Sequence, residues 1–384
     1  MKTSARVILF LCAWGFVAGT PAQDAVSGAS VQKPQARPLE FSSAGMRLRI
    51  EDVARTGDAV WAMDFIASDT MIFTERHGRF ALLNLQSGKI VPIEGGPTVL
   101  QHDSGGLFDV LPDPDFATNG ILYYTYVKPQ GENSATALGR GRLRGTRLTA
   151  LTDLFVANSA SADPAHWGSR IAMDKRRLLF LTIGDRHIAN DAQRLASHSG
   201  KILRLRADGS VPQDNPFVGK RDAAPEVWSF GHRNPQGLVI HPVTGQLLSQ
   251  EHGPSGGDEV NLIRAGANYG WPVITHGTDI WGGQLPEGTA KAGMEQPLKY
   301  WKPGVAPTGI AIYTGDRYPG WRGNLFSTTL RGPLHRLTLD GERITAEEVL
   351  LDWTERVRDI AEGPDGLLYL ATESGRIVRI VRLR

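Results

Sequence analysis

A histidine and an aspartate whose spacing suits acid–base chemistry stand out in this sequence. His166 comes directly before one predicted strand, and Asp185 follows the strand that would pair with it. Because a hairpin brings its two ends together, the Asp185 carboxylate can reach the His166 imidazole. A carboxylate on one ring nitrogen fixes the tautomer and strengthens the other nitrogen as a base. We therefore predict that His166 is a general base; the alternative is a histidine that only packs in the core.

Arginines on predicted loops form the second candidate group. Arg233 is followed by Asn234 and Gln236, which supply hydrogen-bond donors and acceptors. Three more arginines lie on loops beside two later strand pairs: Arg331, Arg356 and Arg358. A guanidinium group binds carboxylates or phosphates through two parallel hydrogen bonds. Four of them converging in a chain with 42 basic and 40 acidic residues predict a small polyanionic ligand; ordinary surface salt bridges are the alternative.

The segment Glu251–Glu259 (EHGPSGGDE) has the residue types of a calcium site. Its glycines and proline leave backbone carbonyls accessible, and Asp258 and Glu259 add carboxylates, so the ligands are the oxygens that Ca²⁺ takes. The lack of clustered His or Cys argues against zinc or copper. An acidic turn without a metal explains the same residues. The segment also matches Gly-x-Ser-x-Gly, but strand-like residues follow where a nucleophile elbow requires a helix, which argues against a serine hydrolase.

A strand–turn–strand sequence pattern that occurs six times predicts the fold that must position these candidate site residues. Each copy is a short apolar strand, a turn with Asp, Pro or Gly, and a second strand. The copies are Val60–Phe73, Leu107–Tyr126, Arg170–Ile183, Gly237–Ser249, Gly309–Ser327 and Asp359–Thr372, and their starts lie 47 to 72 residues apart. We predict an all-β fold, a six-bladed β-propeller of four-stranded antiparallel blades, which closes radially and so hides its sheet edges. A pair of β-sandwiches is the alternative.

The beginning of the chain has the features of a targeting signal followed by a flexible leader. Residues 1–22 have a basic start, an apolar run of about 12 residues and a small-residue exit, the layout of a secretory signal peptide. Residues 23–45 are predicted to be a flexible leader, and residues 46–384 the single propeller domain. Cys12, the one cysteine, would leave with the signal, which fits a periplasmic or secreted protein. No later segment has the length of a membrane span, and the balanced charge argues against nucleic acid as a partner.

Taken together, the motifs resemble the soluble pyrroloquinoline-quinone-dependent glucose/sorbosone dehydrogenase family, and within it the periplasmic aldose sugar dehydrogenases. The resemblance runs from about Val60 to Ile380 and rests on HWGSR, TIGD, GKILRLRADGSVPQDNPF, GHRNPQGL, EHGPSGGDEVN, NYGWP and RVRDIAEGPDGLLYL. It implies a six-bladed propeller that holds pyrroloquinoline quinone (PQQ) at its axis with Ca²⁺. The implied reaction oxidises the anomeric carbon of an aldose to a lactone by hydride transfer to the quinone.

The resemblance also implies a role for each candidate residue. His166 would be the base for the anomeric hydroxyl, and Asp185 would orient it. The cofactor-binding residues would be Ser104, Arg233, Asn234, Gln236, Arg331, Arg356 and Arg358. The calcium ligands would be Gly253 and Pro254 beside the quinone, with Glu259 and Tyr269 at a second, structural ion.

Two positions depart from the family pattern, and two other functions stay open. Ser104 replaces the usual Gln and could reach the cofactor only through water, while Arg331 replaces the usual Lys and changes the geometry of the charge. The loop of residues 275–302 would form much of the substrate rim, where a sugar ring could stack on Trp281, Tyr300 and Trp301. The competing functions are a propeller lactonase and a non-catalytic propeller that binds carbohydrate or a partner. The sequence does not specify the sugar, the electron acceptor, or whether the protein is a monomer or a homodimer.

Overall fold

The computed structural model describes residues 39–101, 103–278 and 286–383. Within them, twenty-five strands form six sheets, and the only helical segments are α1 (Phe116–Asn119) and the 3₁₀ turn η1 (Ala189–Gln193). The described part of the chain holds no helix long and apolar enough to cross a membrane. The predicted signal peptide and most of the predicted leader lie outside the described residues.

Strands that follow one another in the chain are neighbours in each of the first three sheets. The first sheet contains β3 (Val60–Ala67), β4 (Thr70–Glu75), β5 (Arg79–Asn84) and β6 (Ile90–Ile93). The second contains β7 (Leu107–Pro112), β8 (Ile121–Gln130), β9 (Asn133–Arg144) and β10 (Arg147–Val156). The third contains β11 (Ile171–Met173), β12 (Leu178–Ile183), β13 (Lys201–Arg206) and β14 (Val227–Phe230).

The next two sheets repeat this order. The fourth contains β15 (Pro235–Ile240), β16 (Leu247–Glu251), β17 (Asp258–Ile263) and β18 (Lys299–Trp301). The fifth contains β19 (Pro307–Ile312), β20 (Leu325–Thr329), β21 (Leu334–Asp340) and β22 (Arg343–Leu351). All strand pairs in these sheets are antiparallel.

The sixth sheet joins the two ends of the described chain. It contains β23 (Val357–Glu362), β24 (Leu368–Thr372) and β25 (Arg376–Arg382), followed by β2 (Met46–Arg55) and β1 (Glu40–Ser43). Strand β2 lies antiparallel to β25, with Leu48 opposite Arg382. Because β1 pairs with β2 and Phe41 packs against the core, the predicted leader extended too far. This sheet therefore has five strands where four were predicted.

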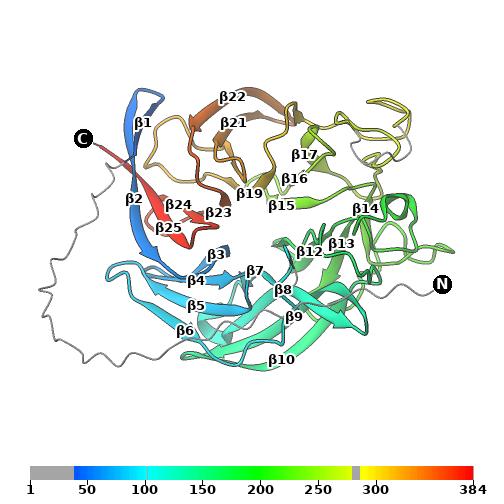
Figure 1. Cartoon of the computed structure of the whole chain (residues 1–384), viewed down its shortest axis with the longest axis horizontal. Helices are drawn as coiled ribbons and strands as arrows, with labels where there is room; N and C mark the ends of the chain where they lie inside the picture. Colours follow the sequence, from blue (N-terminus) through cyan, green and yellow to red (C-terminus); the bar gives the residue numbers. More distant parts are fainter. Residues whose placement is uncertain (1–38, 102, 279–285, 384) are drawn as a thin grey trace, which may run out of the picture. The chain divides into compact units, whose positions relative to one another are not determined.

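The six predicted hairpins are confirmed, and their first strands surround the molecular axis. These inner strands contact one another in a closed ring, in the order β3, β7, β11, β15, β19, β23 and back to β3 (Figure 1). Apolar side chains of neighbouring sheets pack between the blades; one such cluster joins Ile72 and Phe80 of the first sheet to Tyr124 of the second. The fold is the predicted six-bladed β-propeller, and loops that precede neighbouring inner strands contact one another, as Gly168 and Asn234 do.

Candidate active site

His166 and Asp185 are in contact, as their hairpin spacing predicted. The Nδ1 of His166 lies 2.6 Å from Oδ1 of Asp185, and Asp185 is 1% exposed. The indole of Trp271 donates to the other Asp185 oxygen at 2.8 Å, and the backbone N–H of His187 donates to Oδ1 at 3.0 Å. Burial opposes ionisation of Asp185, but the hydrogen bond and the charge of His166 keep its pKa below the ordinary value. Asp185 is thus a carboxylate that accepts from three donors, and His166 carries its proton on Nδ1.

The backbone around His166 is tightly constrained. His166 has a φ of 54°, in the left-handed region that few non-glycine residues adopt. A Cβ on Gly184 would lie 2.0 Å from the His166 carbonyl oxygen, so only glycine fits at that position. Asn234 and Gln236, which were predicted to contact a cofactor, both bind Gly168: the Asn234 oxygen accepts from its N–H at 3.2 Å, and the Gln236 amide donates to its carbonyl at 3.1 Å. These two side chains hold the loop that carries His166.

Two further residues of this site were missed in the sequence. The Nε2 of His187 lies 3.0 Å from the Nε2 of His166, and the Nδ1 of His187 lies 2.8 Å from Oδ2 of Asp163. Burial lowers the pKa of His166, with the Asp185 hydrogen bond opposing and the neighbouring Arg233 and His187 adding to the decrease. His166 is therefore poised as a neutral imidazole whose free nitrogen faces a second histidine. The only sequence signal was the position of His187 two residues after Asp185.

The predicted arginines fall into two groups. Arg356 and Arg358 both bind the carboxylate of Glu373, and Arg356 also donates to the Leu330 carbonyl at 3.5 Å, next to the exposed Arg331. Burial lowers the pKa of Arg358, and Glu373 opposes that effect. Arg76, which was missed in the sequence, lies near enough to Arg358 to lower its pKa further. Three guanidinium groups, those of Arg76, Arg356 and Arg358, therefore lie close together around the carboxylate of Glu373.

Arg233 belongs to the second group. Its guanidinium donates to the His252 carbonyl at 3.3 Å and lies 5.4 Å from the Trp271 ring, while its backbone N–H donates to Glu251 at 2.6 Å. Trp271 thus touches both Asp185 and Arg233. The hydroxyl of Ser104 donates to the Pro164 carbonyl at 3.0 Å, in the loop before His166.

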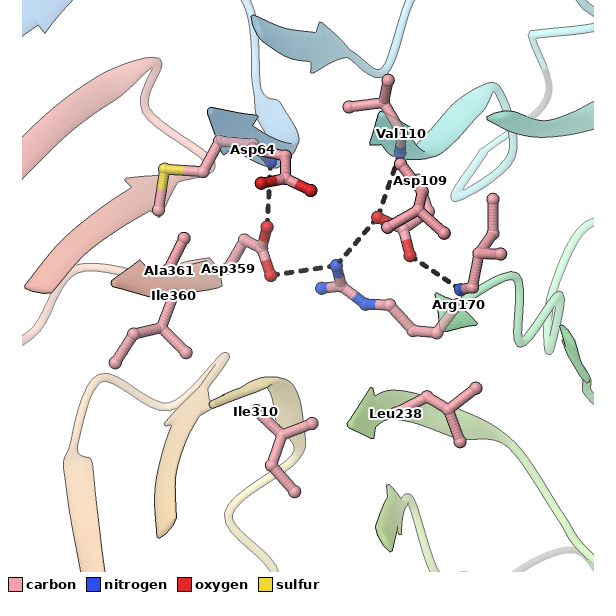
Figure 2. A pocket seen from close by; sticks show the side chains of 12 residues that line it. Asp64, Asp109, Val110, Arg170, Leu238, Ile310, Asp359, Ile360 and Ala361 are labelled. Atoms are coloured by element: carbon pink, nitrogen blue, oxygen red, sulfur yellow. Dashed lines mark hydrogen bonds and ion pairs between the residues drawn. The ribbon is translucent and has the colours of Figure 1, made fainter. Parts of the chain in front are cut away.

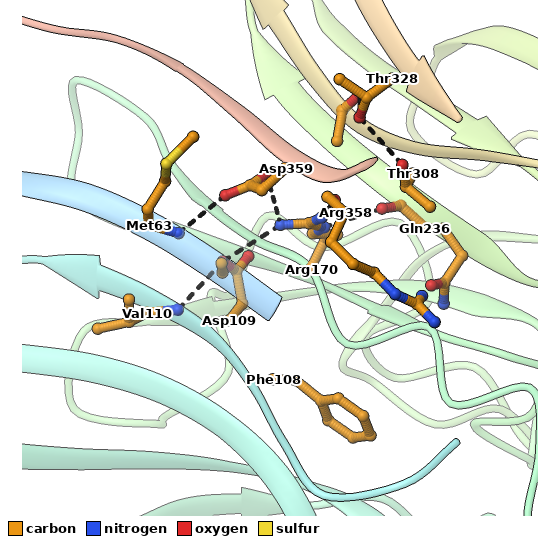
Figure 3. Close-up of polar contacts among 12 residues, drawn as sticks. Met63, Phe108, Asp109, Val110, Arg170, Gln236, Thr308, Thr328, Arg358 and Asp359 are labelled. Atoms are coloured by element: carbon orange, nitrogen blue, oxygen red, sulfur yellow. Dashed lines mark hydrogen bonds and ion pairs between the residues drawn. The ribbon is translucent and has the colours of Figure 1, made fainter. Parts of the chain in front are cut away.

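A buried arginine at the propeller axis, Arg170, links two of the predicted cofactor-binding residues. Arg170, 5% exposed, donates to the backbone carbonyls of Gln236 at 2.8 Å and of Arg358 at 2.7 Å (Figure 3). The same guanidinium binds Asp359 at 2.9 Å and lies 3.6 Å from Asp109. Buried charges are tolerated when they are paired and hydrogen-bonded. Arg170 therefore fixes two predicted cofactor-binding residues, on β15 and β23, relative to each other.

Carboxylates from three inner strands face a cavity at the axis. Asp64, Asp109 and Asp359 line this space of about 160 Å³ together with Arg170 (Figure 2). Burial raises the pKa of Asp64 and of Asp109 to about 7, and raises that of Asp359 despite its bond to Arg170. One arginine among three carboxylates leaves the axis poor in positive charge.

The four predicted metal ligands line one small cavity. Gly253, Pro254, Glu259 and Tyr269 surround a space of about 20 Å³, room for one water-sized particle, together with Arg233 and Trp271. A Cβ on Gly253 would lie 2.4 Å and 2.3 Å from the carbonyl oxygens of Gly256 and Gly257, so backbone oxygens crowd this position. Carbonyl and carboxylate oxygens are the ligands that Ca²⁺ prefers, so the residues present fit this ion.

The carboxylates beside this cavity differ in how far hydrogen bonds already occupy their oxygens. Glu251 and Glu259 share the amide of Asn261, at 3.2 Å and 3.1 Å, and burial with the nearby Glu251 charge raises the pKa of Glu259 to about 8. Asp258 instead accepts backbone N–H groups on both oxygens. The Tyr269 hydroxyl donates to the Leu262 carbonyl at 2.5 Å and accepts from the backbone N–H of Arg264 at 2.9 Å, so it is already occupied on both sides. Among the residues described, no group of three His, Cys, Asp or Glu side chains has an arrangement that could hold a metal ion by itself.

The prediction for the substrate rim is partly wrong. Trp301 is 6% exposed and donates its indole N–H to Glu347 of β22 at 2.6 Å, so it packs between the fourth and fifth blades and cannot stack on a sugar. Because successive residues of a strand point to opposite faces, its neighbour Tyr300 is exposed and stacks on His276, with ring centres 4.0 Å apart. Trp281 lies outside the described residues.

Comparisons with known proteins agree with this fold over most of the chain. The chain is 36% identical over 333 residues to the aldose sugar dehydrogenase YliI of Escherichia coli, covering 84% of this chain and 90% of that protein. It is 27% identical over 390 residues to quinoprotein glucose dehydrogenase B of Acinetobacter calcoaceticus, covering 78% and 80%. A crystal structure of a glucose dehydrogenase, 39% identical, matches with a TM-score of 0.83 and covers 87% of this chain and 99% of that one.

The family model described as glucose/sorbosone dehydrogenase matches residues 58–379. That range contains all six inner strands and every candidate site residue named above. The two relatives described above are named an aldose sugar dehydrogenase and a quinoprotein glucose dehydrogenase. By this match over most of its length, the chain belongs to the glucose/sorbosone dehydrogenase family.

Proposed function

We propose that this chain is a PQQ-dependent aldose dehydrogenase that oxidises the anomeric carbon of an aldose to a lactone. The observation that carries the proposal is the buried His166–Asp185 pair, at 2.6 Å, in a propeller of the glucose/sorbosone dehydrogenase family. Asp185 accepts the hydrogen bond of His166 Nδ1–H, so the proton stays on Nδ1 and the Nε2 nitrogen is the basic one. A neutral imidazole with a lowered pKa is suited to take a proton from a sugar hydroxyl near neutral pH.

The residues present fit an anionic quinone. Arg76, Arg356 and Arg358 offer guanidinium groups around a single carboxylate, and the loop of Arg331 is in contact with Arg356. Carboxylates of a ligand would bind these groups through charge-assisted hydrogen bonds. When bound, the quinone would supply the hydride acceptor, and Ca²⁺ beside it would supply Lewis acidity. Further contacts to the cofactor or the sugar would come from Ser104, Arg233, Asn234 and Gln236.

The calcium ligands that we propose are the carbonyls of Gly253 and Pro254 for an ion beside the quinone, and Glu259 with Tyr269 for a second, structural ion. Support comes from their shared cavity and from the paired carboxylates Glu251 and Glu259. Two like charges this close are costly when both are ionised, and a divalent cation removes that cost.

We further propose that the protein is exported and passes its electrons to an external acceptor. The support is the layout of residues 1–22, with a basic start and a short apolar run, and the absence of cysteine after that segment. Mass analysis of the N-terminus of the protein isolated from cells tests this cleavage.

One reconstitution experiment tests the enzymatic proposal. Protein purified without cofactor is supplied with PQQ and Ca²⁺, and reduction of an artificial dye is followed with a panel of aldoses. We expect turnover with both additions and none with NAD in place of the quinone. Hydrolysis of sugar lactones without the quinone would instead establish the competing lactonase function.

The matched variants are His166→Gln and His241→Gln. His166→Gln should lose about 10²–10⁴-fold in turnover while quinone binding is retained, because a general base contributes that factor. His241 lies in the turn between β15 and β16 and serves as the control for loss of an imidazole. Parental turnover in His166→Gln would show that the base lies elsewhere.

A further inference from the structure

His166 does not stand alone at this site, because a second imidazole faces its basic nitrogen. The two Nε2 atoms of His166 and His187 are 3.0 Å apart, and the ring centres are 3.9 Å apart with the planes inclined by 64°. This distance is that of an N–H···N hydrogen bond. The edges of the rings therefore meet at the atom on which the proposed reaction depends.

The hydrogen-bond partners determine where the protons of the pair lie. His166 Nδ1 faces Asp185, whose oxygens also receive the N–H groups of Trp271 and His187. His187 Nδ1 faces Asp163 at 2.8 Å, whose other oxygen accepts the N–H of Ala165 at 2.9 Å. A carboxylate only accepts, so both Nδ1 atoms carry protons. Each neutral ring then presents a lone pair at Nε2, and two lone pairs at 3.0 Å repel unless one proton lies between them.

We propose that His166 and His187 act as a single two-ring base, an inference that rests on the proposed function. The sugar O–H bond breaks, and its proton binds between the two Nε2 atoms while the hydride, with its electron pair, goes to the quinone. The proton then leaves to water from His187, and both rings return to the neutral state. One proton and one hydride are thus removed from each sugar, and His187 is a catalytic residue of the proton path.

The exposure of the groups gives the path its direction. The side chain of His166 is 12% exposed and that of Asp185 2%, whereas His187 is 45% exposed and Asp163 30%. A proton on His166 has little access to water, while the same proton on His187 has a solvated ring and a neighbouring carboxylate. The order Asp185, His166, His187, Asp163 therefore runs from the interior to the surface.

The surroundings hold the two rings in this position. His166, Arg186 and His187 have φ values of 54° to 55°, a left-handed conformation that is unfavourable for non-glycine residues. Arg186 is fully buried, lies over the Trp167 ring and donates to the carbonyls of Asp163 and Ala165. The charged and titratable groups that face the pair are Asp163, Asp185, Arg186, Arg233 and His252. Strained backbone maintained by a buried clamp is typical of functional sites.

The first test requires no catalytic activity. In protein without cofactor, ¹⁵N NMR signals of the ring nitrogens are followed as a function of pH for the parent and for His187→Ala. We expect the His166 and His187 rings of the parent to titrate together and to take up one proton between them. In His187→Ala, His166 should titrate alone. Independent uptake of one proton by each ring of the parent would overturn the proposal.

The second test measures the reconstituted enzyme. His187→Ala should lower kcat more than it raises KM, by less than the roughly 10²–10⁴-fold expected for loss of the base itself. Free imidazole added to the assay should restore kcat, because it can carry the proton that the missing ring no longer carries. His187→Gln, which fills the same space without a basic nitrogen, should remain slow and should not respond.

The outcomes separate this proposal from the proposed function. Parental turnover in His187→Gln, or no response of His187→Ala to imidazole at an unchanged Tm, would refute the proton path. His241→Ala, which removes another imidazole, should retain the parental kcat. If the parent protein oxidises no aldose, the proposed function fails, whereas the shared proton is still decided by the NMR titration.

Discussion

Replacing Asp185 by Asn tests how strictly the site controls the tautomer of His166. The carboxylate receives His166 Nδ1 and His187 N on one oxygen and the Trp271 indole on the other. An amide keeps one accepting oxygen and replaces the second with an NH₂ donor. In one orientation, the NH₂ group faces the Trp271 donor. In the other, it faces His166 and draws the proton of that ring to Nε2, where it blocks the base.

The expected loss follows from these contacts. Both orientations remove the charge-assisted hydrogen bond from His166, worth about 1.5–3 kcal/mol, or about 10- to 150-fold in rate. The orientation that reverses the tautomer adds to this, because only the fraction of molecules with a free Nε2 can react. We therefore expect turnover to fall by about 10²–10⁴-fold, the upper end being the roughly 10⁴-fold loss seen when a triad carboxylate is replaced by its amide.

The assay is dye-coupled sugar oxidation at saturating PQQ and Ca²⁺, with kcat measured as a function of pH. The matched control is Asp174→Asn, because Asp174 accepts only backbone N–H groups, from Arg176 and Leu178, and an amide oxygen can do the same. The variant should bind quinone as the parent does. If Asp185→Asn keeps the parental kcat and pH profile, Asp185 does not set the tautomer, and the assignment of His166 Nε2 as the base is wrong.

Three further predictions concern the axis and the metal cavity. Arg170→Met leaves Asp359 buried without its cation and should lower the free energy of unfolding by about 3–5 kcal/mol, measured by urea denaturation. Burial raises the pKa of Asp64 from 3.8 to about 7. The protonated Asp64 side chain therefore contributes stability at low pH, and this contribution is lost as the pH rises through 7. Asp64→Asn should raise Tm more at pH 8 than at pH 5. Ca²⁺ should raise the Tm of the parent, and this shift should be smaller in Glu259→Gln; an equal shift in both would place the structural ion elsewhere.

The fold could be predicted because each blade repeats a local signal. Strand periodicity and turn residues identify the six hairpins, and radial closure is the arrangement that leaves few exposed edges. The strand Glu40–Ser43 was missed because its pairing partner β2 belongs to the sheet made by the opposite end of the chain. The four residues of β1 do not alternate between apolar and polar side chains, so their sequence gives no local indication of an added outer strand.

The site could be predicted only where its contacts are local or where a family motif covers them. The contact between His166 and Asp185 follows from one hairpin, whereas Trp271 reaches Asp185 from 86 residues away. His187 was missed because the left-handed backbone at that residue, φ 55°, turns the ring back toward His166. Trp301 was misassigned because aromatic residues on neighbouring positions look alike in sequence, although one faces the core and the other faces solvent.

The joint between β2 and β25 has a consequence for how the molecule folds. Arg376 binds Asp52 at 2.8 Å, although 324 residues separate them. Closing so long a segment of unstructured chain costs roughly 5 kcal/mol of entropy, which earlier folding of the intervening blades would reduce. During synthesis the ring stays open until β25 has emerged. Until then β2 lacks its partner on one side, and such an unpaired strand edge favours aggregation. Deleting β2 or β25 would leave an unpaired edge permanently, so both strands are needed to close the ring.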